Sequence, residues 1–294
     1  MNKKLYWALI IVFSIIFIIS AVFVVDYIID AYKNKQMNAG LQVSTPPSHT
    51  GTLRQPTTPT RPGTTGTTPF PTTVPPTTVT NPTSIQTQTP SSSTSASGML
   101  PELETLFNIN SDVVGYIYIP DTNVNYPVLQ RPSEKDYYLY RDFYGREDRH
   151  GSIYVREACD VFGPSDNVTI YGHNMADGSM FAHILKFKDE TFFDDHPVIY
   201  FDTLYERHVY QVVCVFRTSG TYGVGFPFHL YDNFADEEEF NAFIKGIRKR
   251  NDRVDMVNDS GIAVEYGDKF ICLSTCEDWP IKNGRLVLLA VRIS

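Results

Sequence analysis

The first feature of the chain is an almost unbroken run of apolar residues over Leu5–Val25, interrupted only by two serines. An α-helix of about 20 residues spans the hydrocarbon core of a bilayer. Cleaved signal peptides have a shorter apolar region that ends at a site of small residues, and no convincing site follows this run. The pattern predicts an uncleaved transmembrane signal anchor over residues 5–29, with residues 1–4 in the cytoplasm.

After this run the apolar residues become sparse, and Thr, Pro and Ser dominate residues 41–98. Such a composition buries too little apolar surface to offset the entropy of ordering, and its prolines favour extended conformations. We predict a disordered stalk over residues 30–98 that carries a domain outside the cell. The stalk is either a spacer through a cell wall or an ordinary linker, and the sequence leaves both open.

Residues 99–294 have the size of one folded domain. Leu103 and Leu106, with Pro101 in a first turn, predict a short N-terminal helix. Short runs of apolar, β-branched and aromatic residues follow, separated by turn residues, and they predict a mostly antiparallel barrel or sandwich. The expected strands cover residues 113–119, 124–129, 152–155, 167–171, 198–201, 208–217, 262–265, 269–275 and 286–293.

A second helix is expected late in the domain, over residues 236–250. Asp236 and Glu239 fit a capping box at its start, and basic residues near its end suit the helix dipole. A further helical turn is expected near residues 179–185. The apolar face of the late helix has the spacing of three and four residues typical of an amphipathic helix and consists of Phe240, Phe243, Ile244 and Ile247.

The charge of the domain limits its partners. The whole chain carries a net charge of −8, and the six basic and two acidic residues of the first 98 positions leave −12 on the domain. A domain this acidic is poorly suited to nucleic acid. It would tolerate a cationic amine.

The four cysteines are few for an exported fold built on disulfides. Cys272 and Cys276 lie on one expected strand about 13 Å apart, beyond the reach of a disulfide. A bond between Cys159 and Cys214 stays open. The histidines and cysteines show no pair of short ligand spacings of the kind that zinc needs, so no metal is expected.

Three residues that suit acyl transfer lie at the ends of expected strands. Cys276 closes one strand, His173 follows another, and Arg285 begins the last. A thiol with a neighbouring base is a nucleophile, and a guanidinium can stabilise an oxyanion. Each residue alone has an ordinary alternative, namely a core cysteine, a loop histidine or a surface arginine.

The flanks of these residues give the chain a resemblance to the sortase family over residues 100–294. Sortases carry a Thr-Leu-x-Thr-Cys strand followed about ten residues later by an arginine, and Cys272–Cys276 with Arg285 match it. The family histidine sits in a segment like Tyr171–Met175. Four further segments look familial in the same order, namely 114–120, 125–130, 137–139 and 151–154. The helix 236–250 is similar to the insertion that distinguishes class B.

The resemblance implies an eight-stranded β-barrel with an N-terminal helix and a helical insertion between late strands. It implies a metal-independent transpeptidase without a cofactor, in which Cys276 attacks the carbonyl after a threonine of an Asn-Pro-x-Thr type sorting signal on a secreted protein. His173 would transfer protons and Arg285 would hold the signal and the oxyanion. An amine of a peptidoglycan precursor or a pilin lysine would resolve the thioacyl enzyme. Further supporting or substrate-binding candidates are Ser274, Thr275, Asp278, Thr218 and Tyr222.

The sequence departs from the family at Cys272, where threonine is usual. Cys272, Ser274 and Cys276 are expected to face one side of the strand. Cys272 is either a core residue or a resolving or regulatory thiol. Other functions remain open alongside wall anchoring: a pilin-polymerising sortase, a non-catalytic wall-binding module with the same fold, and a peptidase that releases proteins to water.

Overall fold

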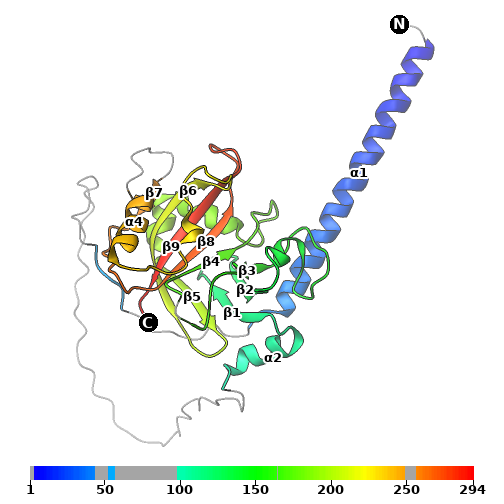
Figure 1. Cartoon of the computed structure of the whole chain (residues 1–294). Helices are drawn as coiled ribbons and strands as arrows, with labels where there is room; N and C mark the ends of the chain where they lie inside the picture. Colours follow the sequence, from blue (N-terminus) through cyan, green and yellow to red (C-terminus); the bar gives the residue numbers. More distant parts are fainter. Residues whose placement is uncertain (1–2, 44–51, 57–97, 164, 249–255) are drawn as a thin grey trace, which may run out of the picture.

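The computed structural model describes residues 3–43, 52–56, 98–163, 165–248 and 256–294 (Figure 1). Its first element is helix α1 (Lys3–Gly40), which projects away from the rest of the molecule with its apolar side chains exposed. By length and composition α1 can cross a membrane. Residues 30–40 are helical, so their assignment to a disordered stalk is wrong. Good helix formers such as Ala, Lys, Gln and Met fill this stretch, and its first glycine is Gly40.

The last turns of α1 lie on the folded domain. Leu41 is buried in a cluster with Leu103 and Leu106 of helix α2 (Pro101–Ile109), the predicted N-terminal helix. Arg149 forms an ion pair with Asp30 of α1. The helix that could cross a membrane is therefore continuous with a segment that packs against the domain.

A second contact joins the predicted stalk to the far end of the domain. Arg54 donates two hydrogen bonds of 2.6 and 2.7 Å to the carboxylate of Asp268, and Pro56 forms a β-bridge with Ile262. Residues 52–56 are thus attached to the domain, against the expectation of a free stalk. The remainder of the predicted stalk, residues 44–51 and 57–97, lies outside the described residues.

The domain is built on a closed barrel, as predicted. The strands β5-β1-β2-β3-β4-β8-β9-β6 pair in this order, and β5 pairs with β6 to close an eight-stranded barrel, while β7 adds to the edge of β6. The strands are β1 (Val113–Tyr118), β2 (Asn125–Leu129), β3 (Ile153–Val155), β4 (Asn167–Tyr171), β5 (Val198–Thr203), β6 (Val209–Ser219), β7 (Met256–Asp259), β8 (Phe270–Cys276) and β9 (Gly284–Arg292).

The prediction of a strand over residues 262–265 is wrong. The strand in this region is β7, and the chain then turns at Gly261, which has a φ of +68°. Ile262 is nonetheless 1% exposed, and Val264 packs against the same buried cluster. The apolar alternation that predicted a strand therefore reflects burial without a full ladder of hydrogen bonds.

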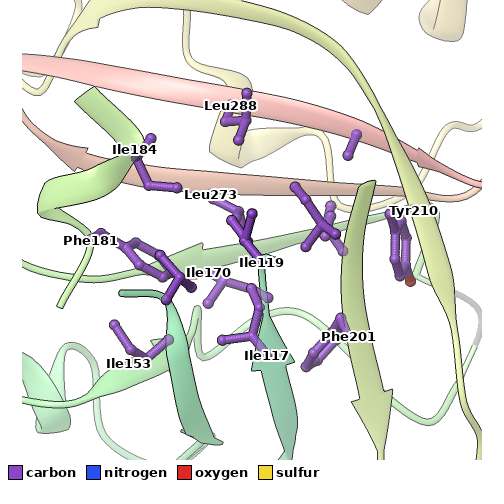
Figure 2. Close-up of a cluster of buried hydrophobic side chains, with 14 of the residues drawn as sticks. Ile117, Ile119, Ile153, Ile170, Phe181, Ile184, Phe201, Tyr210, Leu273 and Leu288 are labelled. Atoms are coloured by element: carbon purple, nitrogen blue, oxygen red, sulfur yellow. The ribbon is translucent and has the colours of Figure 1, made fainter. Parts of the chain in front are cut away.

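Two apolar clusters cover the two faces of the central strands. Figure 2 shows the cluster inside the barrel, where Ile170, Leu273 and Leu288 meet. Cys272 and Leu289 point to the opposite face and join a second cluster. Because both faces are buried, β8 and β9 read as almost continuous apolar runs.

Helix α4 (Glu237–Arg248) covers the outer cluster and corresponds to the predicted insertion. Asp236 accepts a 2.9 Å hydrogen bond from the backbone N–H of Glu239, which confirms the predicted cap. Its buried side chains are Phe240, Phe243 and Ile247, three of the four predicted.

Four shorter helices lie in the part of the domain that the structure describes. The turn expected near 179–185 is the 3₁₀ helix η2 (Ala182–Lys188), and the sequence did not predict α3 (Glu190–Asp195). Two further 3₁₀ turns, η1 (Tyr137–Tyr140) and η3 (Phe228–Leu230), lie beside the groove described below.

The docking of α1 generates a prediction for Leu41→Asp. A charge in this buried position should detach the end of α1, because burial of an unpaired carboxylate is unfavourable. Limited trypsin digestion of the full chain in detergent should then cut after Lys33 and Lys35 several times faster. The exposed neighbour Gln42 provides the matched control Gln42→Asp. Equal cleavage of both variants would contradict the docking.

Candidate active site

The pairing of β4 with β8 places His173 beside Cys276. These strands are parallel, with Tyr171 opposite Ser274. His173 and Cys276 each lie two residues beyond this pair. Gly172 N–H donates to the carbonyl of Ser274 at 3.2 Å, which continues the pairing past the strand end. The Asn174 side chain donates to the carbonyl of Cys276 at 3.2 Å. Residues about a hundred positions apart therefore meet at one end of the barrel.

The pairing of β8 with β9 adds Arg285 to this end. Arg285 lies opposite Cys276, and Thr218 of β6 lies opposite Arg285 on the other side. The guanidinium donates to the carbonyl of Gly284 at 3.0 Å. A Cβ on Gly220 would approach its Cζ to 3.0 Å, so the loop after β6 lies directly against the guanidinium. The three predicted catalytic residues are thus brought together.

A backbone contact defines the orientation of His173. Its Nε2 lies 2.7 Å from the carbonyl oxygen of Leu139, at the end of η1. A carbonyl can only accept, so Nε2 carries the proton and Nδ1 is the nitrogen left to exchange protons. The Tyr140 ring packs on the imidazole with centroids 5.4 Å apart. Burial lowers the pKa of His173, the bond to Leu139 opposes this, and the charges of His150 and Arg285 lower it further.

A groove of about 760 Å³ passes over these residues. It is lined by the loop 219–225 with η3, and by residues of η1 and of the start of the β3–β4 connection. A groove of this volume has room for several side chains of a bound ligand. Of the predicted site residues it is lined by His173, Ser274, Thr275, Cys276, Arg285 and Tyr222.

Two predicted residues lie away from the groove surface. Thr218 is buried, and its hydroxyl donates to the carbonyl of Phe226 at 3.0 Å and accepts from the N–H of Phe226 at 2.8 Å. It therefore closes the base of the loop that carries the fully exposed Tyr222. Asp278 is exposed and is not among the residues that line the groove, so the structure does not bring it to Arg285 or His173.

The acid next to the predicted nucleophile was missed. The Glu277 side chain is 7% exposed and lies between two cations, with Oε2 2.8 Å from Nε of Arg217 and Oε1 2.5 Å from Nζ of Lys188. These pairs fix the backbone after Cys276 to β6 and η2. One feature of the sequence could have identified Glu277. It directly follows Cys276, and because side chains alternate along a strand, its side chain is expected to point away from the groove.

Cys272 occupies the outer cluster beneath the site. It faces the same side as Ser274 and Cys276, as predicted, but it is fully buried under the region that α4 covers. Burial raises the pKa of its thiol. Cys272 and Cys214 both pair with Leu289 from opposite sides, so a strand separates them. These contacts favour the core interpretation of Cys272.

The remaining cysteines are also thiols. Cys159 and Cys214 are free and buried, so the disulfide that the sequence left open does not form. Burial raises the pKa of the Cys159 thiol to about 12, which keeps it protonated at neutral pH. Among the described residues, no group of three or more His, Cys, Asp or Glu side chains is arranged to hold a metal ion.

Comparison with known proteins agrees with the geometry. The sortase domain model matches residues 117–293. Sortase B of Listeria monocytogenes is 29% identical over 200 residues, which is 67% of this chain and 77% of that protein. Sortase B of Staphylococcus aureus is 28% identical over 193 residues, which is 66% of this chain and 75% of that protein.

Solved structures give the same result. A crystal structure of sortase B from Bacillus anthracis in complex with AAEK1 superimposes with a TM-score of 0.57 and 32% identity, covering 67% of this chain and 86% of that one. A Staphylococcus aureus sortase B–substrate complex gives a TM-score of 0.59 and 28% identity, with the same coverage of both chains.

The chain therefore belongs to the sortase family, whose members are cysteine transpeptidases. The relatives and structures just named are sortases of class B, and the chain is of this class.

The environment of His173 predicts its titration. We expect a midpoint below the ordinary value of 6.5, because burial disfavours the imidazolium. The unfolded chain then takes up the proton first, so this residue destabilises the fold as pH falls through 6.5. NMR titration of histidine-labelled protein measures the midpoint, and His173→Gln assigns the signal. A midpoint at or above 6.5 would be inconsistent with the buried geometry.

The bonds of Thr218 predict a loss of stability on substitution by valine. Thr218→Val leaves the buried backbone groups of Phe226 without their partner, and we expect the free energy of unfolding to fall by about 1–3 kcal/mol. Thr218→Ser keeps the hydroxyl and serves as the control. Urea unfolding of the full chain in detergent measures both variants. Equal stability of the two would show that the hydroxyl does not hold the loop.

Proposed function

We propose that this protein is a membrane-anchored transpeptidase that joins secreted proteins to an amine of the cell wall through a thioacyl enzyme on Cys276. The observation that carries the proposal is the convergence of Cys276, His173 and Arg285 in one groove of about 760 Å³, set by the pairing of β4, β8 and β9. Class B membership supports an Asn-Pro-x-Thr type of sorting signal as the substrate.

In the first half-reaction Nδ1 of the neutral His173 takes the thiol proton of Cys276, and the resulting thiolate attacks the carbonyl carbon after the threonine of the signal. The new C–S bond forms while the carbonyl oxygen gains negative charge, which Arg285 neutralises. The imidazolium of His173 then gives its Nδ1 proton to the leaving amine as the C–N bond breaks. The bond from Nε2 to Leu139 keeps Nδ1 available for this transfer. A thioester and a free peptide amine result.

In the second half-reaction an amine replaces the thiolate. It loses a proton to Nδ1 of His173 and attacks the thioester, and collapse of the tetrahedral intermediate breaks the C–S bond. The thiolate then takes the proton back from the imidazolium, which restores the Cys276 thiol and the neutral His173. The acceptor is an amine of a peptidoglycan precursor, or a lysine of a pilin if the protein polymerises pili. The net charge of −12 on the domain suits a cationic acceptor and not nucleic acid.

The location follows from α1 and from the substrates. Helix α1 can cross a membrane once, and we place residues 1–4 in the cytoplasm and the domain 99–294 outside the cell. A sorting signal and a wall precursor both reach the enzyme on that side. Ser274, Thr275 and Tyr222 line the groove. Of these, Tyr222 is exposed and can contact the signal, whereas Ser274 and Thr275 are buried. Thr218 acts through the loop it closes.

The test incubates the full chain in detergent with a fluorogenic Asn-Pro-x-Thr peptide library and an amine. Cys276→Ala should lower cleavage at least about a thousandfold, because it removes the nucleophile. Cys272→Ala is the matched control and should retain activity, since Cys272 lies in the outer cluster.

The products distinguish the alternatives. An amide product supports transpeptidation, whereas free acid alone indicates a peptidase. Comparison of a peptidoglycan-type amine with a pilin lysine peptide separates wall anchoring from polymerisation. No cleavage by the wild type, or cleavage that persists in Cys276→Ala, would contradict the proposal and favour a non-catalytic wall-binding module.

A further inference from the structure

We propose that His150 is a positioning residue that holds together the two loops on which the catalytic geometry of His173 depends. The inference rests on the proposed role of His173 as the proton-transfer group. His150 lies outside the groove and is fully buried, which is unusual for a histidine without a ligand. Its contacts join the connection after η1 to the loop that begins at His173.

The first contact anchors His150 within its own loop. Its Nδ1 lies 2.8 Å from Oδ1 of Asp148, and the same oxygen accepts the backbone N–H of His150 at 2.7 Å. The backbone N–H of Asp148 in turn donates to the carbonyl of Tyr140 at 3.1 Å. The imidazole is therefore fixed relative to η1, which supplies both Leu139 and Tyr140 to the surroundings of His173.

The second contact reaches the loop of His173. Nε2 of His150 lies 3.4 Å from Oδ2 of Asp177, four residues after His173, which is within ion-pair distance, although this buried nitrogen has no hydrogen-bond partner among the described residues. The other oxygen of Asp177 accepts the hydroxyl and the N–H of Ser179 at 2.6 and 3.0 Å, and Phe181 N–H donates to the carbonyl of His173 at 2.8 Å. Asp177 thus belongs to a tightly closed loop that carries His173.

The residue after His150 supports the carbonyl that orients His173. Gly151 has a φ of +59°, and a Cβ there would lie 2.3 Å from the carbonyl oxygen of Leu139. The backbone therefore passes directly against the acceptor of the His173 N–H. A shift of His150 would move this carbonyl, and a misplacement of about 1 Å at a catalytic group can cost a hundredfold in rate.

Electrostatics strengthens the link when the imidazole of His150 is charged. Asp148 faces it from its own loop, Asp177 from the His173 loop and Asp30 from α1. The charged ring can donate to both Asp148 and Asp177, whereas a neutral ring has one N–H. The charge of His150 is also one of the causes that lower the pKa of His173, after burial.

Two substitutions separate the contacts. An asparagine amide can occupy the place of Nδ1 and keep the bond to Asp148. A glutamine amide can occupy the place of Nε2 and keep the polar contact to Asp177. If the link to the His173 loop matters, His150→Asn should lower kcat about tenfold with KM nearly unchanged, and His150→Gln should retain most of it. Asp177→Asn should resemble His150→Asn.

The assay is peptide transfer by the full chain in detergent, with thermal unfolding and the His173 titration measured on each variant. In His150→Asn we expect the His173 midpoint to rise, because His150 is one of the groups that lower the pKa of His173. The double variant His150→Asn with Asp177→Asn should lose little more than either single variant, since both break one contact.

When the wild type is active, these measurements test the role of His150 separately from the proposed function. Variants with unchanged kcat and an unchanged His173 midpoint would overturn it, even if they melt at a lower temperature. Equal losses in His150→Asn and His150→Gln would also overturn the link to Asp177. If His150→Asn fails to fold, Asp177→Asn decides in its place. Inactivity of the wild type would instead contradict the proposed function.

Discussion

The parallel pairing of β4 with β8 is the constraint on which the rest of the structure depends. Parallel neighbours need a long crossover, so their register is held by burial on both faces instead of by a hairpin. With Tyr171 opposite Ser274, both strands end at one level, and the chain leaves β4 as the His173 loop and β8 as Cys276. A slip of one residue would turn every side chain of the strand to the other face and separate the two groups.

The covering of the outer face explains how one strand supplies both core and chemistry. Cys272, Ser274 and Cys276 share a face of β8, yet Cys272 is fully buried under the cluster that α4 caps and Cys276 reaches the groove. The face of β8 changes from buried at Cys272 to groove-lining at Cys276 within four residues. The outer cluster ends there, because β6 continues into the loop that Thr218 closes. The departure from the family at Cys272 is thus a difference in packing behind the site, and not a second thiol within it.

The sequence predicted the elements whose signals are local. The apolar run of α1, the capped helix α4 and the strands of the barrel follow from spacing, and familial segments identified Cys276, His173 and Arg285. It failed where long-range contacts decide. Residues 262–265 have the pattern of a strand because Ile262 is buried, and the end of α1 was assigned to the stalk because its docking partner is distant in sequence. Glu277 was not predicted, because its partners Arg217 and Lys188 lie on other elements. His150 carries no motif, and only its burial between two loops reveals it.

The Thr/Pro/Ser-rich segment 41–98 is attached to the domain within its first part and directly behind its end, and this changes what the segment can determine. Leu41 and Arg54 contact the domain, and the backbone N–H of Leu100 donates to the carbonyl of Leu204. A tether whose two ends are tied to one body cannot lengthen the arm between that body and its base. In the proposed membrane-anchored arrangement, the contacts of the last turns of α1 hold the domain near the bilayer surface, and substrates would meet the groove there. In such a plane, an acceptor held by the same membrane meets the groove at a high effective concentration.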